Sequence, residues 1–448
     1  MKNHLLTLRD KLSASYWFIP TLMAILAVVL SITTIKLDEG IGRDIRWVSG
    51  LVYVDSPEGA RAVLSTVASS MITVAGTVFS LTMVVLSLTS QQYGPLVLSH
   101  FMRDRGNQFV LGIFTATFLY CLLILRTIRG VESSNFVPHI SVLTGLGLSV
   151  ASLAVLIYFI HHVSQSIQAP QIIARISDDL SDSIDDLFPA HLGKELKPVN
   201  QERLKTLPSR FDAEQTDAVP TSESGYLQMV DDNALLNTAR EHQVVIYLDV
   251  LPGQFLFQKQ PLVRIFPKGL LNETIIDDIQ EAFIFGNQRT RTQDIAFTIT
   301  QLSALAVRAL SPGINDPFTA IMVIDHLGEA LRTLLSRQPP SIYRYDEENQ
   351  LRVIAVSVNF ETVFHTAFDQ IMHYGYGDPK VVGRLLQVFK MLWDSTPHDD
   401  ELMLLQHTIT TLYAESQTRL TTREAQQMEK TFEEIARDFQ KLSKPENA

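Results

Sequence analysis

Residues 63–88 read VLSTVASSMITVAGTVFSLTMVVLSL, an apolar run of 26 residues that contains no Asp, Glu, Lys or Arg. An α-helix rises about 1.5 Å per residue, so about 20 apolar residues cross the ~30 Å hydrocarbon layer of a bilayer. Charged side chains are rare in that layer because burying one costs about 3 kcal/mol or more. The run therefore predicts a transmembrane helix that tilts or extends beyond the bilayer.

Three further uncharged apolar runs lie in the first third of the chain, at residues 16–35, 109–125 and 140–160. The first begins with Tyr16 and Trp17, which are aromatic residues typical of the membrane interface, and it lacks a small-residue cleavage pattern. We therefore expect a retained helix rather than a cleaved signal peptide. Together the four runs predict a four-helix transmembrane domain over residues 1–160.

The predicted second span is unusual in its hydroxyl groups, which recur at alternating steps of three and four residues. They are Thr66, Ser70, Thr73, Thr77, Ser80 and Ser87, with Val84 as the one interruption. This spacing places all six on one face of a helix. Two interpretations are open, because small polar residues let neighbouring helices pack closely in lipid and also suit the wet wall of an oligomeric pore.

Charge differs between the two parts of the chain. Residues 1–160 carry a balance of +3 and residues 161–448 a balance of −14, which together make the net charge of −11. The acidic second part argues against nucleic acid as a partner, because phosphate binding needs a clustered basic surface. Its size and charge are typical of an intracellular domain.

Four spans place both termini on the same side of the membrane. Basic residues precede the first span, and Arg103 and Arg105 follow the second, which favours the cytoplasm for both segments. The opposite loop, residues 36–62, also carries four basic residues, so this bias is weak. We expect both the N- and the C-terminus to be cytoplasmic, because the large acidic domain is typical of an intracellular one.

The sequence lacks the motifs of catalysis and metal binding. Cys121 is the only cysteine and lies inside an apolar run, which excludes a disulfide framework and a cysteine metal site. The 12 His residues are scattered, and the sequence has no nucleophile motif, phosphate loop or dinucleotide fingerprint. We therefore expect no enzyme activity, no catalytic residue, no metal and no cofactor.

The rest of the chain is predicted to form an α+β domain in three parts. Residues 161–222 indicate a juxtamembrane helix and a linker. Residues 223–270 contain short strand-like runs and a Pro-Gly turn, typical of a small β-barrel or sandwich similar to the biotinyl and lipoyl carriers, although no lysine stands at a hairpin tip. Residues 271–448 predict a helical bundle, with helices at 273–285, 294–310, 317–336, 360–374, 380–393, 399–415 and 422–441 and one strand at 352–359.

The most distinctive stretch of this domain is ALSPGINDPFTA at residues 309–320. Two prolines and a glycine predict a tight elbow between two helices, the second capped by Asp316. We expect seven residues either to hold the elbow in place or to bind a ligand near it: Arg289, Asp294, Arg308, Ser311, Asn315, Asp316 and Thr319. Capping predicts a structural role, and the alternative is an anionic ligand at the amide groups of the second helix.

The elbow, together with TVFSLT at residues 77–82 and SQQYGP at residues 90–95, resembles the bacterial predicted-membrane-protein family labelled domain of unknown function twenty-two fifty-four. Arg289-Thr290 and Gln293-Asp294 take part in the likeness, which covers nearly the whole chain. The resemblance implies a bacterial inner-membrane protein. It implies no particular activity or ligand.

Two functions fit these observations. The first is a homo-oligomeric ion channel or pore, lined by the hydroxyls of the second span and gated by the cytoplasmic domain, because hydroxyls do not titrate and tolerate partly hydrated ions. The acidic domain would concentrate cations, while Arg103 and Arg105 oppose that preference. The second is a membrane-anchored sensor or scaffold that binds a ligand or protein through its cytoplasmic domain. Expected partners are the lipid bilayer, further copies of the chain, and ions or a small ligand.

Overall fold

The computed structural model describes residues 17–41, 56–98, 101, 104–128, 137–188, 214–337 and 341–442. Tyr16, Arg103 and residues 189–213 of the expected linker lie outside the described residues. The chain divides into two compact units, Met1–Gln171 and Ile172–Ala448.

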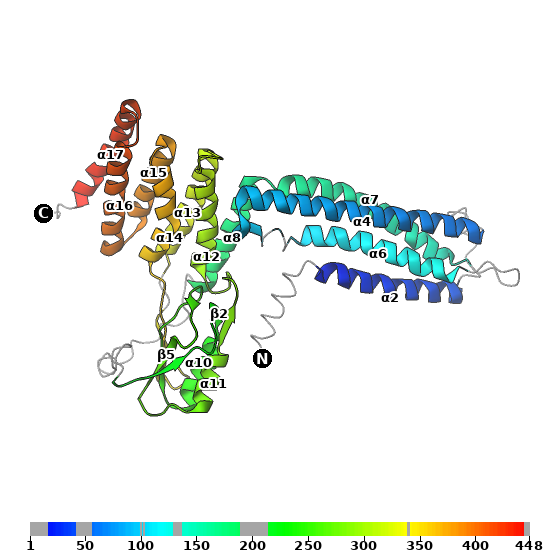
Figure 1. Cartoon of the computed structure of the whole chain (residues 1–448), viewed down its shortest axis with the longest axis horizontal. Helices are drawn as coiled ribbons and strands as arrows, with labels where there is room; N and C mark the ends of the chain where they lie inside the picture. The colour runs from blue at the N-terminus through cyan, green and yellow to red at the C-terminus, as the bar shows by residue number, and fades with distance from the viewer. Residues whose placement is uncertain are drawn as a thin grey trace. The chain divides into compact units, whose positions relative to one another are not determined.

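The described part of the first unit contains the four predicted apolar helices: α2 (Phe18–Ile41), α4 (Pro57–Tyr93), α6 (Arg105–Thr127) and α7 (His139–Ser166) (Figure 1). Each is long and apolar enough to cross a membrane. α4 is the longest, with 37 residues, which is roughly 55 Å at the usual rise per residue. Because this exceeds the hydrocarbon thickness, α4 tilts strongly or extends beyond the bilayer.

Polar side chains accept hydrogen bonds from the free backbone amides at the starts of these helices. Ser56 caps α4 by accepting a hydrogen bond from the amide of Gly59 at 3.1 Å. The first residue before α7 is Pro138, which offers no side-chain cap. Asp38 of α2 replaces that cap, since its carboxylate accepts from the amides of Ile140 and Ser141 at 2.8 and 2.9 Å. The end of α2 and the start of α7 are therefore tied together.

α6 is the central helix of this unit, because its contacts with α2 and α4 are the most extensive between any two helices there and it also contacts α7. Buried apolar side chains form two clusters around it, one with Leu64, Ala68, Tyr120, Cys121 and Ile124 and the other with Ala75, Val78, Val110, Phe114 and Phe159. The residues that α4 contributes recur at helical spacing, so α4 buries one face in the bundle and leaves the other open.

The second unit contains two small sheets. A five-stranded sheet has the order β1 (Asp217–Pro220), β5 (Pro261–Phe266), β3 (Val245–Leu248), β8 (Leu351–Ile354) and β7 (Tyr343–Tyr345), and a three-stranded sheet has the order β4 (Phe255–Leu256), β2 (Gly225–Val230) and β6 (Phe283–Gly286). All pairs are antiparallel except β3 with β8, in which Ile246 lies opposite Val353. The helices α10 (Asp232–Glu241) and α11 (Glu273–Glu281) contact the strands and contribute to one shared apolar core.

The β-strands depart from the expected barrel. Both sheets of the described residues are open, since β1 and β7 are unpaired edges of one and β4 and β6 of the other, and no closed barrel forms. Helices α10 and α11 cover the short strands, so closure is not needed to bury their apolar side chains. Residues 283–285, expected to end a helix, instead belong to β6, because they pair with β2.

Helices dominate the remainder of the second unit. α8 (Ala169–Leu187) begins at the boundary of the units and buries Ile172, Ile176, Leu180 and Ile184 along one face. The other helices are α12 (Ile295–Ala309), α13 (Pro317–Leu335), α14 (Phe360–Gly375), α15 (Pro379–Ser395), α16 (Asp399–Gln417) and α17 (Thr422–Leu442). Their ends agree with the predicted ranges to within two residues, because Asp and Asn caps in the sequence mark most of the starts.

Candidate functional site

The six hydroxyl residues predicted to share one face of the second span do lie on α4, and all are exposed on the isolated chain: Thr66, Ser70, Thr73, Thr77, Ser80 and Ser87. We call this set the hydroxyl stripe. The stripe makes no contact that buries it against α2, α6 or α7 in the described residues. It is therefore open to lipid, water or another chain.

Hydrogen bonds along the stripe direct its acceptor atoms outward. The hydroxyl of Thr73 donates to the carbonyl of Ser69 at 2.8 Å, and that of Thr77 donates to the carbonyl of Thr73 at 3.0 Å. Thr66 and Ser70 donate to the preceding turn in the same way. Because these four protons are used within the helix, the lone pairs of the four oxygens remain available on the outer surface. These four residues of the stripe thus present acceptors rather than donors.

Small neighbours widen the stripe into a shallow surface. Ser65, Ser69 and Gly76 are exposed beside it. A Cβ atom placed on Gly76 would meet nothing within 4 Å in this chain. Larger apolar side chains, such as Ile72 and Leu81, are exposed on either side of the stripe. A surface of small residues allows another helix to approach closely.

The opposite face of α4 is buried and serves as an internal comparison. Thr82 is 6% exposed, and its hydroxyl donates to the carbonyl of Val78 at 2.8 Å. Ala68, Ala75 and Val78 on the same face pack into the bundle. Hydroxyl residues therefore occur on both faces of α4, but Thr82 is buried whereas the stripe and the neighbouring Ser65 and Ser69 are exposed.

One polar pair of the first unit was not predicted from the sequence. The carboxylate of Asp104 caps α6 through the amide of Gly106 and lies 3.0 Å from Nε2 of His162 on α7. His162 also stacks on Tyr158. The position of Asp104 before a helix indicates a cap, but no sequence signal connects it with a residue 58 positions away.

The elbow at residues 309–320 is held by bonds within the chain. Asp316 caps α13, since its carboxylate accepts from the amide of Thr319 at 3.1 Å and from its hydroxyl at 2.5 Å. The hydroxyl of Ser311 donates to the carbonyl of Arg308 at 2.6 Å, and Asn315 adopts a φ of +49°. The Asp316 carboxylate occupies the place that an anion would take at this helix end, which supports the structural interpretation.

Arg289 and Asp294 lie at the other end of α12. The guanidinium of Arg289 donates to both carboxylate oxygens of Asp294 at 2.8 and 2.9 Å, and Asp294 caps α12 through the amide of Phe297. α12 has 15 residues, which separates this pair from the elbow by roughly 22 Å. The structure does not bring the seven predicted elbow residues into one site.

The described residues offer no alternative site for a metal ion. They contain no group of three or more His, Cys, Asp or Glu side chains able to hold a metal ion. The hydroxyl stripe is consequently the candidate site that the geometry favours.

A sequence profile of the family described as "Predicted membrane protein (DUF2254)" matches residues 13–391. This chain belongs to that family. Proteins similar to this chain include the uncharacterized protein Mb1321c of Mycobacterium bovis and the uncharacterized protein Rv1290c of Mycobacterium tuberculosis. Each is 32% identical over 399 residues, which cover 87% of this chain and 73% of the relative. No solved structure matches the chain.

Membership in DUF2254 agrees with the four apolar helices and makes this a membrane protein in contact with a lipid bilayer. The descriptions of the family and of its mycobacterial relatives name no activity. Any function must therefore be argued from the site itself.

Proposed function

We propose that this DUF2254 protein is a homo-oligomeric ion channel or pore of the bacterial inner membrane, with α4 of each copy facing a central pathway. The observation that carries the proposal is the exposure of all six stripe hydroxyls on a helix whose opposite face is buried in its own bundle. Assembly around α4 would turn the exposed stripe into a pore wall.

Lipid is a poor environment for the hydroxyl stripe. Leu, Ile, Phe and Val each gain about 0.3–0.6 kcal/mol at the centre of a membrane helix, whereas small polar residues offer little apolar surface. The other exposed faces of the unit are apolar, as shown by Val150 and Ile157 of α7 at 65% exposure each. The contrast between these faces favours water or a second helix, rather than acyl chains, beside the stripe.

The outward acceptors favour cations over anions in this pathway. Hydroxyl oxygens whose protons are donated within α4 can replace part of the hydration shell of a cation. The net charge of −14 on residues 161–448 would raise the local cation concentration. Arg105 and Arg103 act against this preference and would limit it.

The second unit, Ile172–Ala448, is the gating domain in this proposal, and both termini are cytoplasmic. Single-channel recording from the purified full-length chain in planar bilayers tests the proposal. Cation current that depends on the hydroxyl stripe supports it. Silent bilayers containing intact oligomers contradict it and favour the second candidate.

That second candidate is a sensor or scaffold that binds a ligand or protein through the second unit. It is favoured by aromatic side chains on the edge strand β4 and beside it. Phe255 and Phe257 are 46% and 69% exposed, and Phe255 packs edge-to-face against Tyr226. Exposed aromatic groups beside an unpaired strand edge suit a bound peptide segment.

A further inference from the structure

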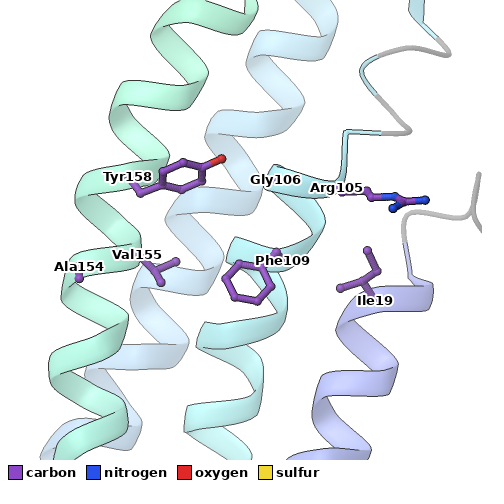
Figure 2. Close-up of a pocket in the computed structure, with 7 residues that line it drawn as sticks. All are labelled: Ile19, Arg105, Gly106, Phe109, Ala154, Val155 and Tyr158. Atoms are coloured by element: carbon purple, nitrogen blue, oxygen red, sulfur yellow. The ribbon is translucent and has the colours of Figure 1, made fainter.

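A groove of about 670 Å³ opens on the surface of the first unit between α2, α6 and α7. Its walls are Ile19 of α2, Phe109 of α6, and Ala154, Val155 and Tyr158 of α7, with Arg105 at one end (Figure 2). Apart from Arg105 and the phenol of Tyr158, these side chains are apolar. The groove lies wholly within the unit that carries the membrane-spanning helices.

Among the described residues, hydrogen bonds join α2 to α7 near one end of each helix. Asp38 of α2 holds the first turn of α7 through Ile140 and Ser141. Ile19 and Tyr158 lie about 18 to 19 residues from that contact on their helices, or roughly 28 Å. At this distance α6, rather than a contact between α2 and α7, forms the floor of the groove (Figure 2).

Gly106 keeps the floor of the groove close to α7. A Cβ atom on Gly106 would lie 2.7 Å from Nε2 of His162, which is closer than real Cβ contacts. Glycine therefore lets the first turn of α6 approach α7 and lets Asp104 bond to His162. Phe109, one turn further along α6, is 45% exposed and supplies the apolar base.

The two polar side chains of the groove lie at about the same level, on opposite sides of Gly106, and that of Arg105 extends away from Tyr158 (Figure 2). Figure 2 shows the hydroxyl of Tyr158 directed toward Gly106, with the side chain of Arg105 at about the same level and Phe109, Val155 and Ile19 below it. Arg105 is exposed and makes no ion pair with another described residue. The neighbouring carboxylate of Asp104 is already engaged by His162 and by the amide of Gly106. Arg105 thus offers an uncompensated positive charge beside an apolar surface.

We infer that the groove binds a membrane phospholipid with an anionic headgroup. An acyl chain lies along Phe109, Val155 and Ala154, and Arg105 donates hydrogen bonds to the phosphate, a geometry that the guanidinium group matches well. Inorganic phosphate would leave the apolar walls unused, and a zwitterionic lipid would gain less from the single cation. This inference depends on the membrane location of the helices but not on the proposed channel.

Native mass spectrometry of the purified full-length chain tests the inference, with phosphatidylglycerol and phosphatidylcholine as competing probes. We expect wild-type protein to retain phosphatidylglycerol about fivefold better, since one cation near anionic lipid contributes about 1 kcal/mol. Arg105→Gln is expected to remove this preference. The matched control is Arg126→Gln, which deletes an exposed cation from the last turn of the same helix, outside the groove, and should leave the preference unchanged.

A second pair of variants tests the apolar walls. Ala154→Trp fills the groove and should lower the occupancy of both lipids by about fivefold. Leu153→Trp places the same side chain at an exposed position of α7 that lies on another face and does not line the groove, and this variant should bind both lipids as wild type does. Comparable melting temperatures establish that all variants are folded. Equal retention of the two lipids by wild type, or an unchanged preference in Arg105→Gln, would overturn the inference and leave only non-specific annular lipid.

Discussion

Thr77 and Thr82 lie on opposite sides of α4, although only five positions separate them. Thr77 is exposed and donates its hydroxyl proton to Thr73, while Thr82 is 6% exposed and donates to Val78. The two residues are chemically identical and make the same kind of bond within the helix. Because their surroundings differ, the same substitution at the two positions distinguishes an effect of the hydroxyl stripe from an effect on helix packing.

Replacing Thr77 by Val is expected to lower the unitary cation conductance by about twofold or more. The substitution preserves shape but removes an acceptor, and the loss of one modest interaction of about 0.5–1 kcal/mol changes a rate by this amount. Thr82→Val should leave conductance unchanged. Single-channel recording checks both variants. A Thr82→Val effect as large as that of Thr77→Val would assign the loss to packing.

Gly76→Leu is expected to shift the purified protein from oligomer toward monomer. The bulky side chain projects from the small surface beside the hydroxyl stripe and keeps neighbouring helices apart. Gly147→Leu is the control, because a Cβ atom at Gly147 of α7 also meets nothing within 4 Å in this chain. Light scattering in detergent measures the oligomer size. An equal oligomer size for the two variants would show that α4 does not form the assembly interface.

Gly253→Ala should lower the melting temperature of the second unit more than Gly269→Ala does. Both glycines have positive φ angles, +92° and +91°, so both variants carry the same backbone strain of about 1–2 kcal/mol. Only at Gly253 would the new Cβ atom overlap the carboxylate of Asp294 and disturb its pair with Arg289. Thermal unfolding followed by circular dichroism measures the difference. Equal shifts would show that the Asp294 pair adds nothing to stability.

Asp346 and Arg352 form a buried pair at 2.7 Å, with side chains 2% and 7% exposed. Burial alone would raise the pKa of Asp346, but hydrogen bonds from Arg352 and from the amides of Gln350 and Glu348 outweigh it and lower that pKa below its ordinary value of 3.8. The ionised carboxylate therefore stabilises the folded state above the ordinary value, and this contribution is lost as the pH falls through the lowered pKa.

Arg352→Gln should accordingly destabilise the second unit at pH 7 by about 3 kcal/mol, because it leaves a buried carboxylate without its cation. The difference from wild type should shrink as the pH is lowered below about 4, because Asp346 then protonates in the unfolded state and the contribution of the native pair to stability is progressively lost. Melting temperatures of both proteins across this range check the prediction. A difference independent of pH would indicate lost packing rather than a lost charge interaction.

The sequence predicted the elements whose formation depends on local physics. Hydrocarbon length and the exclusion of charge locate the four membrane helices, and the Asp316 cap with Pro317 marks the start of α13. Partners distant in the chain were not predictable in this way. β8 is four residues long and pairs in parallel with β3, which places Val353 opposite Ile246 more than a hundred positions away.

The candidate site was predicted to a similar extent. Helical spacing places the six hydroxyls on one face of α4, but it does not say whether that face is buried in the bundle. The answer depends on where α6 packs, and α6 contacts the face that carries Ala68, Ala75 and Thr82. In the same way, no spacing rule joins Asp104 to His162, because their contact depends on two helix ends meeting in the fold.

Aqueous accessibility of Thr77 tests the central claim most directly. The single native cysteine, Cys121, is fully buried and can be replaced by Ala to give a clean background. In that background we predict that Thr77→Cys reacts with a charged methanethiosulfonate reagent and that the reaction blocks the current, while Ile157→Cys on the apolar face of α7 does not react. An unreactive Thr77→Cys in an intact oligomer would contradict the account, because the hydroxyl stripe would then face lipid or protein instead of water.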